Sequence, residues 1–251
     1  MRYYFKIILF ISMVTLGWSC GKTPVCDCFD SAGKEASQVR VVPYFTQVTI
    51  NDNINAYITI GYPEQLTIEG GGNLISNIGA NVSGEVLSLK NNNICNWLRS
   101  YKKSVINVYI TMPQLTNLTN SGYGTIQSQG VINVDSLMLI TTNSPGDIDL
   151  TVNSKIIVGQ MFGTADLTLT GQCQTYEMNY YGGTGFIYNS NLAVSNYLYL
   201  SSNSTGDSYI NCASGGYLQV VTYGQGNVYY SGAPSTVQYA SKGGSGQLIK
   251  E

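Results

Sequence analysis

Three aspartates are the residues of this chain whose type and spacing could do chemistry. Asp147 and Asp166 each follow a small residue at the start of an alternating apolar and polar segment, and Asp207 recurs at the same point two segments later. If such segments stack, carboxylates in neighbouring copies come about 5 Å apart, where they could share a proton or hold a cation. That arrangement would suit a β-helical polysaccharide lyase or hydrolase.

Other features of the sequence argue against catalysis. Phe186 interrupts the aspartate row, and the strands that carry the aspartates have no Lys or Arg to bind a sugar acid. The chain has no His, which excludes Ser-His and Cys-His nucleophile pairs and His-based zinc sites. An Asp after a glycine turn most often accepts hydrogen bonds from nearby backbone N–H groups. We therefore predict no enzyme and no cofactor, with a cation site at Asp147 and Asp166 as the weaker alternative.

The tyrosines are the second group of candidate functional residues. The chain has 20 Tyr and only 10% charged residues, and a Tyr ring offers a large amphipathic contact area at small entropic cost. A surface rich in Tyr and Asn would suit sugars, although rings that stack along strands also simply stabilise a sheet. A net charge of −2 gives no reason to expect nucleic acid as a partner. The candidate ligand contacts are Tyr188, Tyr197, Tyr199, Tyr209 and Tyr229.

A short repeat must position these residues. A small residue, any residue and an apolar residue return at a nearly fixed interval over 124–248, and apolar and polar residues then alternate, as in 147–152. Alternation of this kind predicts half-buried strands. We expect the glycine to supply the positive φ of a tight corner in turns such as 143–146. The copies begin at Gly124, Gly146, Ala165, Gly185, Gly206, Gly226 and Gly246.

A repeat of about 20 residues cannot bury its own apolar face, and its copies must therefore stack. The sequence predicts an all-β, single-domain, right-handed parallel β-helix, or solenoid, with coils of about 20 residues, its hand following the general rule for parallel crossovers. We expect regular coils over 122–251 and degenerate coils over 39–121, with loops projecting at 70–73 and 91–103. The predicted internal column is Ile126, Ile148, Leu167, Ile187, Val228 and Leu248, interrupted by Ser208.

The N-terminal residues have the features of an export signal. Arg2 and Lys6 precede a short apolar run over 7–16, which is too short to span a bilayer stably, and Cys20 follows. Residues 1–19 resemble a bacterial lipoprotein signal peptide, in which Cys20 would be lipidated and become the mature N-terminus. The alternative is an ordinary secreted protein cut nearby. Residues 20–38 are polar and without periodicity, which predicts a lipidated tether.

The expected export of the protein determines how the remaining cysteines are interpreted. Export favours disulfides, and the preferred bridge joins Cys26 or Cys28 to Cys95, although connectivity cannot be deduced from sequence. Cys173 and Cys212 fall at different phases of the repeat. We therefore expect those two to be buried thiols and not bonded to each other.

Three segments resemble the bacterial family described as putative auto-transporter adhesin, head GIN domain. They are Val39-Arg40 ahead of 45–48, then 105–115 running into Gly122-Tyr123-Gly124, and the closing segments 232–237 and 243–246. The resemblance covers roughly 39–250. It implies a β-helical, exported and often lipid-anchored protein of Bacteroidetes-type bacteria, and it supplies no catalytic or binding residues.

These observations combine into one functional expectation. We expect a non-enzymatic, adhesin-like binding scaffold, held by its lipid at the outer membrane or cell surface of a Gram-negative bacterium. Its partners would be the membrane and either a glycan or another envelope protein, and the sequence leaves the ligand and the oligomeric state open.

Overall fold

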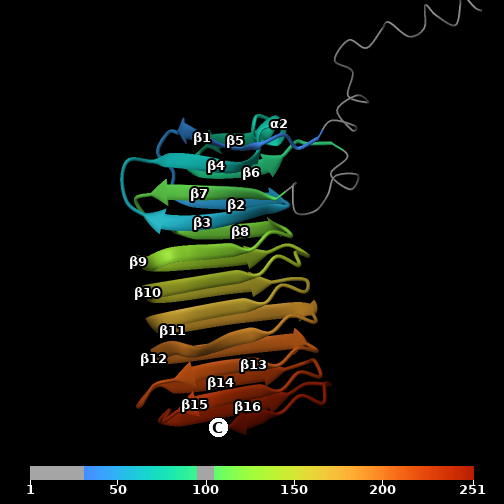
Figure 1. Cartoon of the computed structure of the whole chain (residues 1–251). Coiled ribbons are helices and arrows are strands. Elements are labelled where there is room, and N and C mark those ends of the chain that lie inside the picture. Colours follow the sequence, from blue (N-terminus) through green and yellow to red (C-terminus); the bar gives the residue numbers. More distant parts are fainter. Residues whose placement is uncertain (1–30, 95–104) are drawn as a thin grey trace, which may run out of the picture.

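The computed structural model describes residues 31–94 and 105–251, which form a rod of stacked strands (Figure 1). All strands belong to one 17-stranded sheet that winds around an apolar interior. The strands are β1 (Glu35–Val41), β2 (Gln47–Asp52), β3 (Ile54–Ile60), β4 (Gln65–Gly71), β5 (Ile78–Ser83), β6 (Val86–Asn91), β7 (Ile106–Met112), β8 (Asn117–Gly122), β9 (Ile126–Thr141), β10 (Ile148–Met161), β11 (Leu167–Gly183), β12 (Ile187–Ser204), β13 (Ser208–Cys212), β14 (Tyr217–Thr222), β15 (Val228–Gly232), β16 (Thr236–Ser241) and β17 (Leu248–Lys250). A single helical turn, α2 (Gly72–Ile75), lies at the β1 end.

From β9 onward, the strands pair in parallel with strands of the neighbouring coils. The long strands β9 to β12 pair in chain order, and the later coils are split into shorter pieces, so that β12 pairs with both β13 and β14. The same parallel pairing continues to β17. The predicted parallel β-solenoid and the predicted length of its coils are confirmed.

The predicted apolar column is also confirmed. Register pairs join Ile126 to Ile148, Ile148 to Leu167 and so on through each coil to Leu248, with Ser208 in its predicted place. Ile148 and Leu167 are each 1% exposed. Burial of such side chains stabilises the contact between coils by about 25 cal/mol per Å² of apolar surface.

The reason for the repeating glycines differs from the prediction. Gly146 does not have a positive φ, and the left-handed residue of that turn is Asn143 (φ 52°). A Cβ on Gly146 would instead lie 2.3 Å from the carbonyl oxygen of Gly124, and one on Gly206 would lie 2.3 Å from that of Gly185. Glycine therefore recurs in the repeat because consecutive turns stack backbone on backbone, and only the copy at Ala165 accommodates a Cβ at this position.

The β1 end of the rod is built differently. Antiparallel pairs join β1 to β4, β4 to β7 and β5 to β6, whereas β3 lies in parallel between β7 and β9. Residues 35–38, expected in the tether, lie in β1. The loop predicted at 70–73 is wrong: these residues end β4 and begin α2, and Gly71 is buried against Ala32.

Several predictions fall outside the described residues. They concern the signal peptide, Cys20, the greater part of the tether, the proposed bridge among Cys26, Cys28 and Cys95, and most of the loop over 91–103. Within 31–94 and 105–251, no helix is long and apolar enough to cross a membrane.

Candidate ligand-binding face

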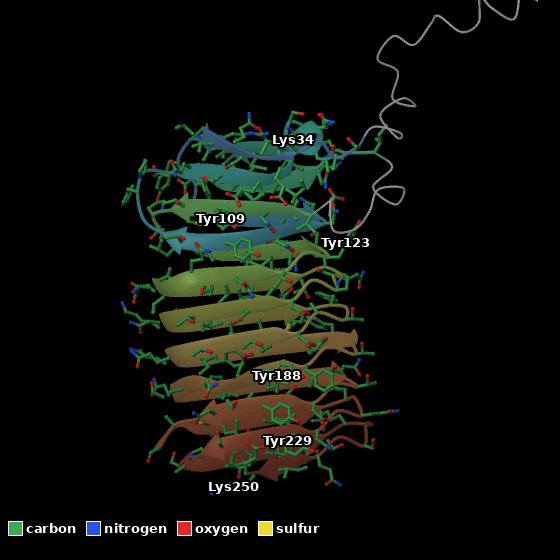
Figure 2. The ribbon with its side chains drawn as sticks, in the orientation of Figure 1. Lys34, Tyr109, Tyr123, Tyr188, Tyr229 and Lys250 are labelled. Carbon is green, nitrogen blue, oxygen red and sulfur yellow. The ribbon has the colours of Figure 1, made fainter. Side chains whose placement is uncertain are left out.

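One row of outward side chains runs along the rod in strand register, crossing β7, β3 and then β9 to β13 and β15. Because side chains alternate along a strand, this row points away from the buried column beside it. Figure 2 shows Tyr109, Tyr188 and Tyr229 on the same side of the rod. The row, called here the tyrosine row, consists of Tyr109, Tyr57, Gln127, Asp149, Thr168, Tyr188, Tyr209 and Tyr229.

The rings of this row stack in two groups. Tyr188 and Tyr209 have ring centroids 5.8 Å apart with planes at 9°, and Tyr209 and Tyr229 are 5.0 Å apart at 11°. Phe186, two residues before Tyr188, stacks on it at 5.7 Å. Near the β1 end, Tyr57 and Tyr109 stack at 4.9 Å. In the C-terminal group, Tyr188, Tyr209 and Tyr229 form a continuous aromatic strip across three coils, called here the strip.

Two of the five candidate tyrosines lie elsewhere. Tyr197 and Tyr199 belong to the second half of β12, outside the tyrosine row. The Tyr197 ring lies 5.8 Å from that of Tyr217, and its hydroxyl donates to Gln219 Oε1 at 2.8 Å. The structure thus brings Tyr188, Tyr209 and Tyr229 together and separates Tyr197 and Tyr199 from them.

The aspartates act on the backbone of the next coil. Asp147 Oδ1 accepts the N–H of Asp166 at 3.0 Å, and Asp166 Oδ1 accepts the N–H of Phe186 at 2.8 Å. Asp207 Oδ1 likewise accepts the N–H of Asn227 at 2.7 Å. These residues lie beside the tyrosine row and are called here the capping row: Asp147, Asp166, Phe186, Asp207, Asn227 and Gln247.

The capping row has a structural explanation without any ligand. Each carboxylate satisfies a backbone donor that would otherwise be unpaired at a turn, which is the bonding expected of an Asp at such a position. In the described part of the chain, no group of three or more Cys, Asp or Glu side chains is placed to hold a metal ion.

The Tyr209 and Tyr109 hydroxyls of the tyrosine row stay protonated at physiological pH. Partial burial raises the pKa of Tyr209, and the nearby charge of Asp207 raises it further. At the other end of the row, burial and the adjacent carboxylate of Glu69 raise the pKa of Tyr109. Both phenols can therefore donate hydrogen bonds to a bound molecule.

The two cysteines of the regular coils lie in the interior of the rod. Cys173 and Cys212 are buried free thiols, as predicted. Desolvation raises the pKa of the Cys173 thiol to about 12, which makes it a poor nucleophile. Neither cysteine is a candidate for chemistry.

Comparison with known proteins places the fold in context. The sequence matches the family described as putative auto-transporter adhesin, head GIN domain, over residues 44–234. Among solved structures, a putative adhesin from Bacteroides fragilis is 22% identical with a TM-score of 0.77, over 87% of this chain and 97% of that one. A putative adhesin from Parabacteroides merdae is 15% identical with a TM-score of 0.65, over 88% and 98%.

A third solved structure carries a different description. A putative lipid binding protein from Parabacteroides distasonis is 14% identical with a TM-score of 0.64, over 89% of this chain and 99% of that one. At these identities the similarities show a common fold. No curated protein matches the chain.

Proposed function

Since this chain belongs to the family of putative auto-transporter adhesins with a head GIN domain, we propose that it is an exported, non-enzymatic binding protein whose contact surface is the tyrosine row. The observation that carries this proposal is the strip of Tyr188, Tyr209 and Tyr229, stacked in register on three consecutive coils. Tyr188 is 41% exposed. An ordered aromatic strip on a rigid sheet loses little conformational entropy when it binds.

The proposal extends to how the rod is attached. Lipidation of Cys20 would hold the tether to the outer membrane or cell surface of a Gram-negative bacterium. The tether leads into β1, at the opposite end of the rod from β16 (Figure 1). This arrangement would place the stacked strip in the half of the rod that lies farther from the membrane.

Attachment is tested with Cys20→Ala, expressed in the natural host and followed by membrane fractionation and mass spectrometry of the N-terminus. We expect a lipid mass on the natural protein and loss of membrane association in the variant. Cys173→Ala is the matched control, because Cys173 is buried in the rod and should not affect attachment. Membrane association retained by Cys20→Ala would rule out the lipid attachment.

A lyase or hydrolase that uses the stacked aspartates is the alternative function. The hydrogen bonds that Asp147 and Asp166 accept from backbone N–H groups of the next coil favour a structural role for both carboxylates. The chain also has no His to act as general base. We expect polysaccharides incubated with the protein to keep their length, and shortening that Asp166→Asn abolishes would establish the enzyme instead.

Binding is tested with the full chain, purified as its host processes it, on immobilised intact bacterial and host cells. We expect saturable binding that Tyr209→Ala weakens strongly. Tyr217→Ala is the matched control, because Tyr217 also packs on a neighbouring tyrosine but lies outside the tyrosine row. Equal binding by the natural protein and Tyr209→Ala would exclude the tyrosine row as the contact surface.

A further inference from the structure

The geometry of the strip points to the class of molecule that it binds, an inference that rests on the proposed function. We propose that Tyr188, Tyr209 and Tyr229 bind an extended, uncharged glycan chain that lies parallel to the rod axis. Each coil would contact one sugar unit. The argument uses the direction of the strip, the side chains on either side of it and the charge around it.

The direction of the strip favours a long ligand. Its rings come from three successive coils, and adjacent parallel strands are about 4.8 Å apart. The ring planes differ by only 9° and 11° from one tyrosine to the next. The strip therefore repeats one nearly identical contact at each coil, across the strands. A chain of extended pyranose units repeats over a similar distance, whereas a compact molecule would use a single ring.

Polar side chains border Tyr209 and Tyr229 on both sides, whereas Phe186 lies beside Tyr188. Asp207 and Asn227 precede Tyr209 and Tyr229 by two residues, and Asn211 and Ser231 follow them by two. The residues between them, such as Ser208 and Ile210, are buried, so the polar neighbours point outward with the tyrosines.

These borders retain hydrogen-bonding capacity. Asp207 uses Oδ1 for the backbone of the next coil, and a carboxylate has about four acceptor sites in total. The Tyr229 hydroxyl accepts from Asn227 Nδ2 at 3.4 Å and can still donate. An apolar strip between polar borders matches a sugar ring, which has an apolar C–H face and hydroxyl groups around its edge.

The charge of this face excludes acidic glycans. Neither the tyrosine row nor the capping row contains Lys or Arg, whereas Asp147, Asp149, Asp166 and Asp207 are all acidic. A polymer of uronic acids, or one rich in phosphate, would meet like charges without a compensating cation. An uncharged chain meets no such barrier.

The first test compares ligands. The full chain is titrated with linear uncharged β-glucan, β-mannan, β-galactan and β-N-acetylglucosaminan oligomers of increasing length. The polyuronate obtained by oxidising the C6 hydroxyls of the best binder serves as the matched anionic probe. We expect one class to bind with an affinity that rises until the oligomer spans the three rings and then levels off. The polyuronate should bind roughly tenfold more weakly or worse. Absence of binding to every uncharged polymer, or tighter binding of the polyuronate, would overturn the inference.

The second test compares variants on the best oligomer. Tyr209→Ala should weaken binding roughly tenfold, the scale expected for a central aromatic contact, whereas Tyr209→Phe should retain it. Tyr188→Ala and Tyr229→Ala should each shorten the oligomer length at which affinity levels off. Tyr217→Ala should bind like the natural protein, and circular dichroism establishes that each variant is folded. If folded Tyr188→Ala and Tyr229→Ala proteins showed the same dependence of affinity on oligomer length as the natural protein, the glycan would not lie along the rod axis.

The tests separate this inference from the proposed function. Periodate destroys the vicinal diols of surface sugars but leaves most protein surfaces able to bind. Tyr209-dependent binding to cells that survives periodate, without competition by any uncharged oligomer, would mean that the partner is a protein. In that case the glycan inference fails and the proposed function stands. If neither cells nor oligomers bind, both fail.

Discussion

At position 148 the coil stack accepts only an apolar side chain. Ile148 lies between Ile126 and Leu167 and is 1% exposed, so an Asp there would be a buried charge without a partner. We expect Ile148→Asp to cost about 3–5 kcal/mol and to leave much of the protein unfolded by circular dichroism. Thr168→Asp makes a similar change in the outward tyrosine row and should remain folded. An Ile148→Asp protein with normal circular dichroism and melting would contradict the buried column.

A second prediction at the residue scale concerns alkaline pH. Desolvation raises the pKa of Cys173 from 9.0 to about 12, and it raises the pKa of fully buried Tyr176 well above its ordinary value of 10.0. The unfolded chain therefore releases these protons at lower pH than the folded protein does. Their contribution to stability is complete below about pH 9 and is lost as pH rises toward the folded pKa values.

This dependence can be measured by urea unfolding at a series of pH values. With no His in the chain, we expect the free energy of unfolding to be nearly constant between about pH 6 and 8 and to fall above about pH 9. Cys173→Ala should reduce the slope between about pH 9 and 12. Burial also raises the pKa of the Cys212 thiol, so Cys212→Ala should change the slope in the same direction. An unchanged slope in Cys173→Ala would show that its thiol is not desolvated.

Among structural elements, the turns between coils are the most sensitive to side-chain size. A Cβ on Gly206 would lie 2.3 Å from the carbonyl oxygen of Gly185, a collision with backbone that cannot move without separating two coils. We expect Gly206→Ala to destabilise the protein by about 1–3 kcal/mol, measured as a lower urea midpoint with an unchanged m-value. Gly61→Ala is the control, since a Cβ there meets only Thr111 Cγ2 at 3.7 Å. Equal midpoints for the two variants would contradict the close approach of the turns.

The elements also show how far sequence alone could predict this structure. The coils from β9 onward were predictable because the short local period of the repeat fixes which residues become neighbours. The strand register shows that Tyr188, Tyr209 and Tyr229 share one position of that period. Tyr197 and Tyr199 were grouped with them by residue type alone, and the strand register separates them.

The N-terminal strands have no regular repeat in their sequence that would predict which strands pair. Tyr57 and Tyr109 are far apart in sequence but stack, because β3 and β7 are paired in parallel. The antiparallel pairing of β1 with β4 is also long-range, and it is supported by Arg40, which donates to the carbonyl oxygens of Ile75 and Ile78. Such pairings depend on the packing of the whole β1 end, so alternation within one strand predicts the strand but not its partner.

On the scale of the whole molecule, the rod resembles a one-dimensional stack in which each coil contacts only its neighbours. Central strands such as β10 and β11 have a parallel partner on both sides, whereas β16 pairs with β14 alone and β17 with β15 alone among the described strands. Stability should therefore fall toward the coil of β16 and β17, and amides there should exchange with solvent fastest.

Two cavity-forming substitutions test this decrease in stability along the rod. Leu169 in β11 and Leu218 in β14 are both 0% exposed, and Leu→Ala at either site costs about 2–5 kcal/mol locally. We expect Leu218→Ala to raise hydrogen exchange mainly over β13 to β17 and to leave β9 to β11 protected. Leu169→Ala should weaken protection on both sides of its coil. If both variants lowered protection uniformly from β9 to β17, the coils would unfold as one unit, and nearest-neighbour stacking would not describe the rod.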